Sequence, residues 1–494
     1  MAPSVTVNIS EQWNVSPPPR SVTPTSLSLT FFDIPWLLFP PSQTIFFYQL
    51  RNRHPSSHRH FSTSILPNLK HSLSLSLQHF YPFAGNLVAR PETGEPKIVY
   101  AEGDSVTVAV AESDADFNSL CGDGQRNATL FHQLVPRELP TTRAKNGDVL
   151  ATRLLAVQIT SFPGDGFCIG LTCHHVVSDG RTFNNFLKTW ASFSRDSGRT
   201  HFTAGAPPFY DRSVILDPNS LGPTLLKKVG SLVQGRGGGD GFKPRETGAV
   251  RATFTMGPDQ IDGARRWILA QCGKKNRACP VLLSAYVVAC AFVWVCLVRA
   301  QVGPTGGSAG NNPTYFGFVA GGITRLGYRV PESYFGNCVA FGRAVAARGE
   351  LEGEDGILVA ADAIGRKVKD LDNDVLGGAE DWISEWGPLI GSDHHVNVVG
   401  SPKMDLYKTD FGWSRPRKIE EISIEAVKGV SLTESRGMKG GIEIGVALPR
   451  AKMEAFAGHF TQGIDKLLAS CSNGEDPHFI SDFKSLDIDL AVKT

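Results

Sequence analysis

Two adjacent histidines, followed at close range by an acidic residue, form the most chemically suggestive stretch of the chain. Asp179 comes four positions after His175 within Phe167-Cys-Ile-Gly-Leu-Thr-Cys-His-His-Val-Val-Ser-Asp-Gly-Arg181. A neutral imidazole can take a proton from a hydroxyl or an amine, because its ordinary pKa lies near working pH. We therefore treat His175 as a candidate general base. Asp179 is close enough in sequence to orient its backbone and ring.

Two other readings of this histidine pair stay open. Paired histidines at the end of a strand commonly serve in packing or lie at the surface. A zinc site would need a third ligand, for example Asp393, His394 or His395, and the sequence has no spacing of the zinc-finger or zincin type.

The flanking residues predict a strand before the histidines and a helix after them. Alternating apolar residues indicate a half-buried strand up to Cys173, and Ser178 or Asp179 can cap the helix that follows. The helix is predicted from an apolar face at helical spacing, made of Phe183, Phe186, Leu187 and Trp190. His174 and His175 would then lie at a strand-to-helix switch that faces a cleft.

The histidine stretch and four later or earlier landmarks resemble one family. His175-Val-Val-Ser-Asp179-Gly180 resembles the HxxxDG motif of the BAHD family, plant acyltransferases that use coenzyme A thioesters. The other landmarks, in chain order, are similar to the motifs LTFFDxxW (Leu29–Trp36), YPxAG (Tyr81–Gly85), YFGNC (Tyr334–Cys338) and DFGWG (Asp410–Ser414, with serine at the last position). Together they cover nearly the whole chain and point to the branch that acylates flavonoid and other phenolic glycosides.

The resemblance implies an α/β (α+β) fold of two chloramphenicol-acetyltransferase-like domains. Each is expected to be a mixed β-sheet flanked by helices, with a channel at the interface. We expect an N-terminal domain over 1–210 that carries HxxxD, a glycine-rich crossover linker over 211–245, and a C-terminal domain over 246–494 that carries YFGNC and DFGWS. A chain of 494 residues is also long enough for two cores.

The resemblance further implies roles for individual residues. His175 is expected to be the general base and Asp179 to hold the loop, with a coenzyme A thioester as the acyl donor and no metal. Asp410, Gly412 and Trp413 are expected to give structural support. Many relatives carry D-x-R-x-R-L where this chain has Gly321-Gly-Ile-Thr-Arg325-Leu326, so Arg325 is the remaining candidate to pair with the central aspartate. Ser414 would disturb the fold only if its position needs a positive φ.

The sequence leaves the acyl group open. A malonyl carboxylate calls for a cation, ideally an arginine, and Arg181 is a candidate, although it can equally be a solvent-facing side chain. A hydroxycinnamoyl group calls for an apolar slot instead. By resemblance, Ser284 is expected near the cofactor's pantetheine or phosphate, and Ser401 near the acceptor.

Composition narrows the class of protein. The 49 basic and 48 acidic residues give a net charge of +1, so no global field favours nucleic acid or an anionic membrane. Nine scattered cysteines without a Cys-x-x-Cys pair, and an N-terminus without a signal-peptide pattern, favour a cytoplasmic protein, which we expect to be a monomer. The uncharged stretch Val281–Val298 is at the lower length limit for a membrane span, and we interpret it as a buried helix.

Two alternatives to acyl transfer stay open. A hydrolase could use the same histidine on water, and a non-catalytic family member could bind a ligand or partner. Gly306-Gly-Ser308-Ala-Gly310 also matches the nucleophile-elbow pattern, but proline and asparagine residues flank it where a strand and a helix are required, so we do not expect Ser308 to be a nucleophile.

Overall fold

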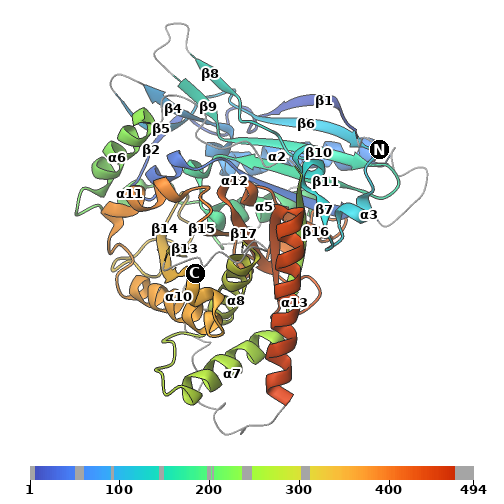
Figure 1. The fold of residues 1–494 in the computed structure, drawn as a ribbon. Helices are drawn as coiled ribbons and strands as arrows, with labels where there is room; N and C mark the ends of the chain where they lie inside the picture. The colour runs from blue at the N-terminus through green and yellow to red at the C-terminus, as the bar shows by residue number, and fades with distance from the viewer. Residues whose placement is uncertain are drawn as a thin grey trace. The chain divides into compact units, whose positions relative to one another are not determined.

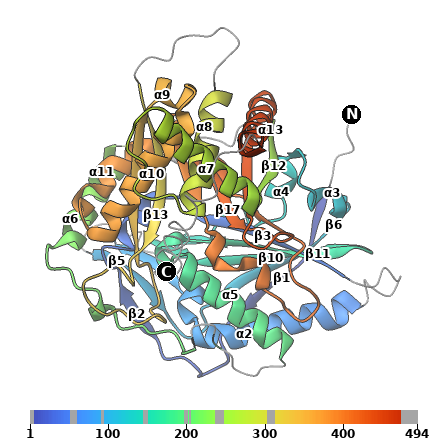
Figure 2. The same ribbon diagram turned by 90° about the horizontal axis from the view of Figure 1, so that it is seen from below.

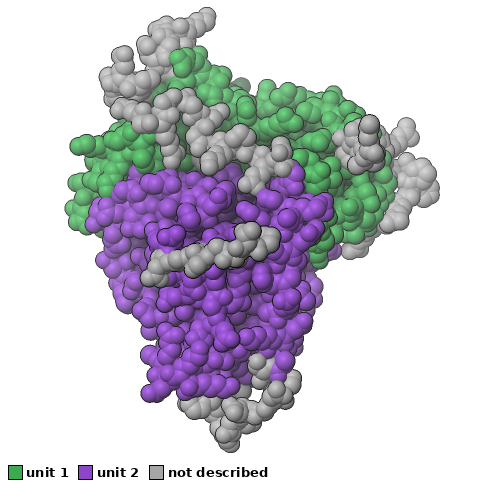
Figure 3. Space-filling view, viewed as in Figure 1, with its two compact units in different colours: residues 1–241, 330–338, 404–423 green, residues 242–329, 339–403, 424–494 purple. Residues whose placement is uncertain are grey.

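The computed structural model describes residues 6–50, 60–90, 94–143, 150–196, 202, 205–235, 248–301 and 312–472 (Figure 1). Its contacts divide the chain into two compact units (Figure 3). Unit 1 comprises 1–241, 330–338 and 404–423, and unit 2 comprises 242–329, 339–403 and 424–494. Ser308 and the glycine-rich run Gly237–Gly241 lie outside the described residues.

The division differs from the expected domain boundary, because both later motifs belong to unit 1. The segment 330–338 carries YFGNC, and 404–423 carries DFGWS. Hydrogen bonds from Asn337 to Asp33 hold the first segment, and the second supplies a strand that pairs with an N-terminal strand. Such long-range contacts cannot be predicted from the order of the motifs along the chain.

The main sheet of unit 1 is mixed. Its strands β6 and β10 run parallel, while every other neighbouring pair is antiparallel. Its order is β1 (Val7–Val15), β6 (Val106–Ser113), β10 (Leu155–Phe162), β11 (Gly166–Cys173), β3 (Ser42–Gln49) and β16 (Lys418–Glu421).

The strand that leads to the histidines, β11, is buried on both faces, rather than half-buried as expected. It lies inside the sheet between β10 and β3, with an apolar core on each side. Phe167, Ile169 and Leu171 pack into one core, and Cys168 packs into the other. The small residues between them could not reveal burial, because glycine and threonine fit either environment.

Two helices of unit 1 cover the core face that holds Phe167. Helix α2 (Leu66–His79) and helix α5 (Gly180–Arg195) lie side by side (Figure 2). Trp190 on α5 is fully buried and donates its indole N–H to the carbonyl of Leu69 on α2, at 3.1 Å. The helix predicted after the histidines is therefore present, and its apolar face packs as the sequence indicates.

A second sheet and several short elements complete unit 1. The sheet order is β2 (Thr25–Ser28), β5 (Gly94–Tyr100), β4 (Asn86–Arg90), β9 (Leu150–Arg153) and β8 (Thr141–Arg143). The short elements are η1 (Ile34–Leu38), η2 (Phe61–Ile65), η3 (Tyr81–Ala84), α3 (Phe117–Leu120), β7 (Arg126–Asn127), α4 (Ala128–His132), η4 (His175–Val177), η5 (Arg212–Val214) and η9 (Leu406–Lys408).

Part of the expected crossover linker is an ordered helix. Helix α6 (Leu221–Gly235) buries Leu221, Leu225 and Val229, spaced four residues apart, on one face. That stripe was masked in the sequence by the glycines and prolines around it. The expected linker 211–245 therefore contains a helix, and the break between the two units after residue 241 falls within its range.

Unit 2 is built on a mixed sheet with helices packed against it. Its strands follow the order β14 (Val339–Ala347), β13 (Pro313–Gly321), β15 (His395–Val399), β17 (Gly429–Glu434), β18 (Ile442–Pro449) and β12 (Ala249–Met256). Its helices are α7 (Pro258–Lys274), α8 (Ala285–Ala300), α9 (Arg348–Glu352), α10 (Gly356–Asn373), α11 (Trp382–Trp386), α12 (Ile424–Val427) and α13 (Arg450–Ser472), with η6 (Ala379–Asp381), η7 (Gly387–Leu389) and η8 (Pro402–Met404).

The uncharged stretch of the sequence forms α8, whose residues are buried almost throughout. It packs against α7, α10 and α13, so an all-round apolar surface is what its place requires. This confirms the interpretation as a buried helix. Among the described residues, no helix has both the length and the apolar character needed to cross a bilayer.

Candidate active site

Strand β11 ends at Cys173 and places both histidines at the strand-to-helix switch. The ring of His174 turns back onto its own loop, where Nδ1 accepts a hydrogen bond from the backbone N–H of Val176 at 3.2 Å. Burial lowers the pKa of His174 to about 4, and the neighbouring His175 adds to the effect. His174 is therefore a neutral side chain that shapes the turn.

His175 is half-buried and lies face to face with the indole of Trp36. The ring centroids are 3.5 Å apart and the planes differ by 7°. Its Nδ1 is buried without a hydrogen bond of regular geometry. Burial lowers the pKa of His175 to about 4, opposed by its own carbonyl, by Asp179, by the Asn337 side chain and by Asp33. The imidazole is thus neutral at physiological pH.

Asp179 is buried and fixes the turn that follows the histidines. One carboxylate oxygen accepts the N–H of Thr182 at 2.8 Å and so caps α5, as the sequence predicts for this position. The other accepts the N–H of Cys338 at 3.1 Å. The side chain therefore joins the HxxxDG loop to the YFGNC segment.

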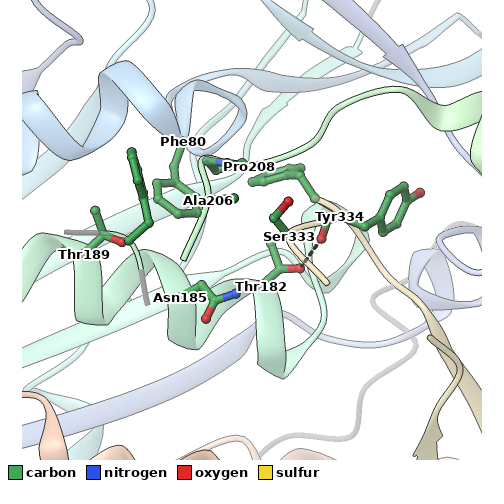
Figure 4. Close-up of a pocket in the computed structure, with 10 residues that line it drawn as sticks. Phe80, Thr182, Asn185, Thr189, Ala206, Pro208, Ser333 and Tyr334 are labelled. Atoms are coloured by element: carbon green, nitrogen blue, oxygen red, sulfur yellow. Dashed lines mark hydrogen bonds between the residues drawn. The ribbon is translucent and has the colours of Figure 1, made fainter. Parts of the chain in front are cut away.

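The nearest cation to Asp179 is Arg181, with 3.8 Å between Nη2 and the carboxylate. Its guanidinium donates to the carbonyls of Glu332 at 2.5 Å and of Tyr334 at 2.8 Å. Thr182 adds a hydrogen bond to the carbonyl of Tyr334 (Figure 4) and another to the carbonyl of Gly336. The crevice at this junction has a volume of only about 10 Å³, so it holds packed side chains rather than a ligand.

Arg325, expected as the partner of the central aspartate, pairs with Asp372 in unit 2. Its Nε lies 2.8 Å from the Asp372 carboxylate, and Nη1 donates to the carbonyl of Gly321. Lys403 lies in the same region, where partial desolvation of its ammonium group and the charge of Arg325 lower its pKa.

A buried aspartate that sequence reasoning left without a role organises the surroundings of His175. Asp33 is fully buried and accepts hydrogen bonds from the backbone N–H and hydroxyl of Thr30 and from both nitrogens of Asn337. It also pairs with Arg212 at 3.0 Å. The amide of Asn337 donates in addition to the carbonyls of His175, at 3.0 Å, and of Val176.

The contacts of Asp33 give two sequence motifs a physical reason. Arg212 also donates to the hydroxyl of Tyr334 at 3.0 Å, so the buried cation serves both LTFFD and YFGNC. Gly336 has a φ of +137°, and a side chain there would run into the guanidinium of Arg212. In the sequence, the only signal for this cluster was the resemblance of positions 30–33 and 334–338 to family motifs.

The DFGWS segment makes contacts within unit 1. The carboxylate of Asp410 accepts the N–H of Gly412, whose φ of +103° and close approach to Arg195 favour glycine. Trp413 packs edge-on against Phe167. Ser414 has no positive φ and its hydroxyl donates to the carbonyl of Gln49 at 3.3 Å, so serine fits here without backbone strain.

The remaining candidates lie in unit 2. Ser284 caps α8 through the N–H of Val287, and the hydroxyl of Ser401 accepts the N–H of Lys403. For the zinc alternative, Asp393 forms an ion pair with Lys428, and His395 is buried beside Trp386. No group of three or more potential metal ligands gathers within the described ranges.

Comparison with known proteins places this geometry in a family. The protein-family model described as "Transferase family" matches residues 5–462 of this chain. Coumaroyl-CoA:anthocyanidin 3-O-glucoside-6''-O-coumaroyltransferase 2 of Arabidopsis thaliana is 36% identical over 93% of this chain and 98% of its own length. The malonyl-coenzyme:anthocyanin 5-O-glucoside-6'''-O-malonyltransferase of Salvia splendens is 37% identical over 93% and 96%.

Solved structures support the fold. Vinorine synthase superposes with a TM-score of 0.62 at 17% identity, over 91% of this chain and 96% of that one. F. sporotrichioides TRI101, crystallised with coenzyme A and T-2, gives a TM-score of 0.60 at 14% identity, over 88% and 97%. The chain thus has the α/β architecture expected from the motifs.

Proposed function

The chain belongs to the Transferase family, the BAHD acyltransferases that its motifs resemble, and on this basis we propose which reaction it performs. It transfers an acyl group from a coenzyme A thioester to a sugar hydroxyl of an anthocyanin, a flavonoid or another phenolic glycoside. Malonyl is the favoured group and hydroxycinnamoyl the next. The observation that carries the proposal is a neutral, half-buried His175 at the end of a fixed strand.

His175 acts as the general base in this proposal. Nε2 removes the proton of the acceptor hydroxyl while its oxygen attacks the thioester carbonyl, which contributes roughly 10²–10⁴-fold to the rate. Collapse of the tetrahedral intermediate breaks the C–S bond and expels the coenzyme A thiolate, which takes the hydroxyl's proton from the imidazolium and leaves the imidazole neutral again. No covalent acyl-enzyme is needed. Asp179 acts through the backbone by holding the loop at Thr182 and Cys338.

The donor preference rests on relatives whose names divide between malonyl and coumaroyl transfer. Arg181 is a weaker candidate for a malonyl carboxylate than its sequence position suggested, since its guanidinium already serves two main-chain carbonyls. Ser284 and Ser401 remain proposed contacts of donor and acceptor. We also infer a cytoplasmic monomer without nucleic-acid or membrane partners, supported by balanced charge and free cysteines.

A donor-by-acceptor panel tests the proposal. Malonyl, coumaroyl, caffeoyl and acetyl thioesters are paired with an anthocyanidin 3-glucoside, a flavonol glucoside and a simple phenyl glucoside, and products are read by mass spectrometry. We expect an acylated glycoside and an equal amount of free thiol. His175→Ala should abolish transfer while coenzyme A still binds, whereas the exposed His394→Ala should remain active.

Two results would count against transfer. Ester cleavage without any thiol cofactor would indicate a hydrolase. Ligand binding without product from any donor would indicate a non-catalytic member of the family.

A further inference from the structure

The stacked pair of Trp36 and His175 has no role in the mechanism above. Trp36 is only 6% exposed, and its ring lies parallel to the imidazole at a centroid distance of 3.5 Å. Nδ1 of His175 makes no hydrogen bond of regular geometry. The face of the indole is a close contact that can fix the rotation of the imidazole.

One buried cluster holds both members of this pair. Trp36 lies on η1, which begins directly after Asp33, and His175 opens η4. Asp33 bonds the amide of Asn337, and the same amide donates to the carbonyl of His175. The helical turn with the indole and the turn with the imidazole are therefore tied to a common point, and their backbones cannot shift apart without breaking buried hydrogen bonds.

The indole also suits the charge that the base acquires. When Nε2 takes the hydroxyl proton, the imidazole becomes a flat cation, and the negative face of an aromatic ring attracts a cation, most strongly when the ring is that of tryptophan. The contact is shielded from water, so the attraction is weakly screened. The neutral and charged states of the same ring thus share one geometry.

We propose that Trp36 is a positioning residue for His175. Its indole face fixes the plane of the imidazole and stabilises the imidazolium that forms as the acceptor hydroxyl loses its proton. The role rests on the proposed acyl transfer for its effect on rate, whereas the contact between the rings can be measured without turnover.

The kinetic test uses Trp36→Phe and Trp36→Leu, with Trp13→Phe as the matched control. Trp13 lies on β1, and its ring faces Lys70 rather than a histidine. We expect kcat to fall roughly 10–30-fold for the leucine variant, with a smaller loss for phenylalanine and little change in KM. The pH at which kcat falls in acid should also shift, least for Trp36→Phe and most for Trp36→Leu relative to the wild type. A purely structural defect would not produce this graded shift.

The optical test does not depend on the substrate. A protonated imidazole quenches a stacked indole, so acidification should reduce wild-type fluorescence while the circular dichroism is unchanged. This component should be absent in Trp36→Phe and in His175→Gln, and present in Trp13→Phe. Quenching that survives in His175→Gln, or a leucine variant with wild-type kcat and acid limb, would overturn the inference. Quenching as expected in a protein that acylates nothing would leave the contact intact and refute the proposed function instead.

Discussion

At the scale of single residues, the proposed base gains availability at the expense of basicity. Burial holds the pKa of His175 at about 4, below the usual value of about 6.5 for an imidazole. A base with a low pKa is never silenced by protonation at physiological pH, but it pulls a proton less strongly. Stabilisation of the imidazolium by its surroundings must make up part of that difference.

The pH dependence of activity follows from this shift. A histidine with a pKa near 4 stays neutral as the pH falls through 6.5, so the acid limb of kcat/KM should appear close to pH 4. The measurement is the initial rate at low substrate concentration across buffers of constant ionic strength, with circular dichroism to verify folding. An acid limb at about pH 6.5 would mean that the ring is well hydrated in solution.

Residue-level reasoning from sequence succeeded where the chemistry is local. The capping role of Asp179 and the position of His175 at the strand end follow from neighbouring residues. Asp33, Arg212 and Asn337 could not be assigned roles, since the contacts that Asp33 makes with Arg212 and with Asn337 span more than 100 positions. The tie between Arg325 and Asp372 was hidden for a similar reason.

At the scale of elements, the buried ion pair of Asp33 and Arg212 connects η1 with η5 and with the YFGNC segment. A buried pair adds little net stability when compared with an apolar pair, but removing one partner leaves an uncompensated charge. The pair therefore matters most for fixing which segments meet.

Arg212→Met should lower the free energy of unfolding by about 3–5 kcal/mol, because the Asp33 carboxylate is left buried without its cation. Tyr334→Phe is the matched control, since it removes only the hydroxyl that Arg212 contacts and should cost about 1 kcal/mol. Urea unfolding followed by fluorescence gives both values. Equal effects of the two substitutions would show that the charge of Arg212 is not needed.

The spacing of apolar residues predicted the long helices better than it predicted the burial of strands or the structure of the linker. The apolar stripe after the histidines and the uncharged stretch both became helices, α5 and α8. Burial of β11 on both faces and the helix α6 inside the expected linker were missed. In both cases glycine or other small residues concealed the apolar pattern, because they fit buried and exposed positions alike.

At the scale of the whole molecule, buried histidines make acid stability a property of the fold. Burial lowers the pKa of His395 to about 4, and the same holds for His174. Between about pH 6.5 and pH 4 these histidines bind protons in the unfolded chain but stay neutral in the folded protein. Stability is therefore fully present above about pH 6.5 and is lost progressively as the pH falls toward 4.

His395→Leu removes one of these groups and should flatten the dependence of unfolding free energy on pH across this window. The exposed neighbour His394→Leu serves as the control and should keep the wild-type slope. Urea titrations at several pH values provide the measurement. An unchanged slope in His395→Leu would show that the ring takes up its proton over the same pH range in the folded protein as in the unfolded chain.

The two-sided burial of β11 also bears on how the enzyme fails when heated. A strand packed between two cores cannot unfold alone, and His175, the proposed base, lies directly after the end of this strand. Fraying of outer segments should therefore leave catalysis intact up to the melting of unit 1 as a body. When the enzyme is warmed, the loss of activity and the cooperative unfolding transition should occur at the same temperature. No folded but inactive state should be populated between them.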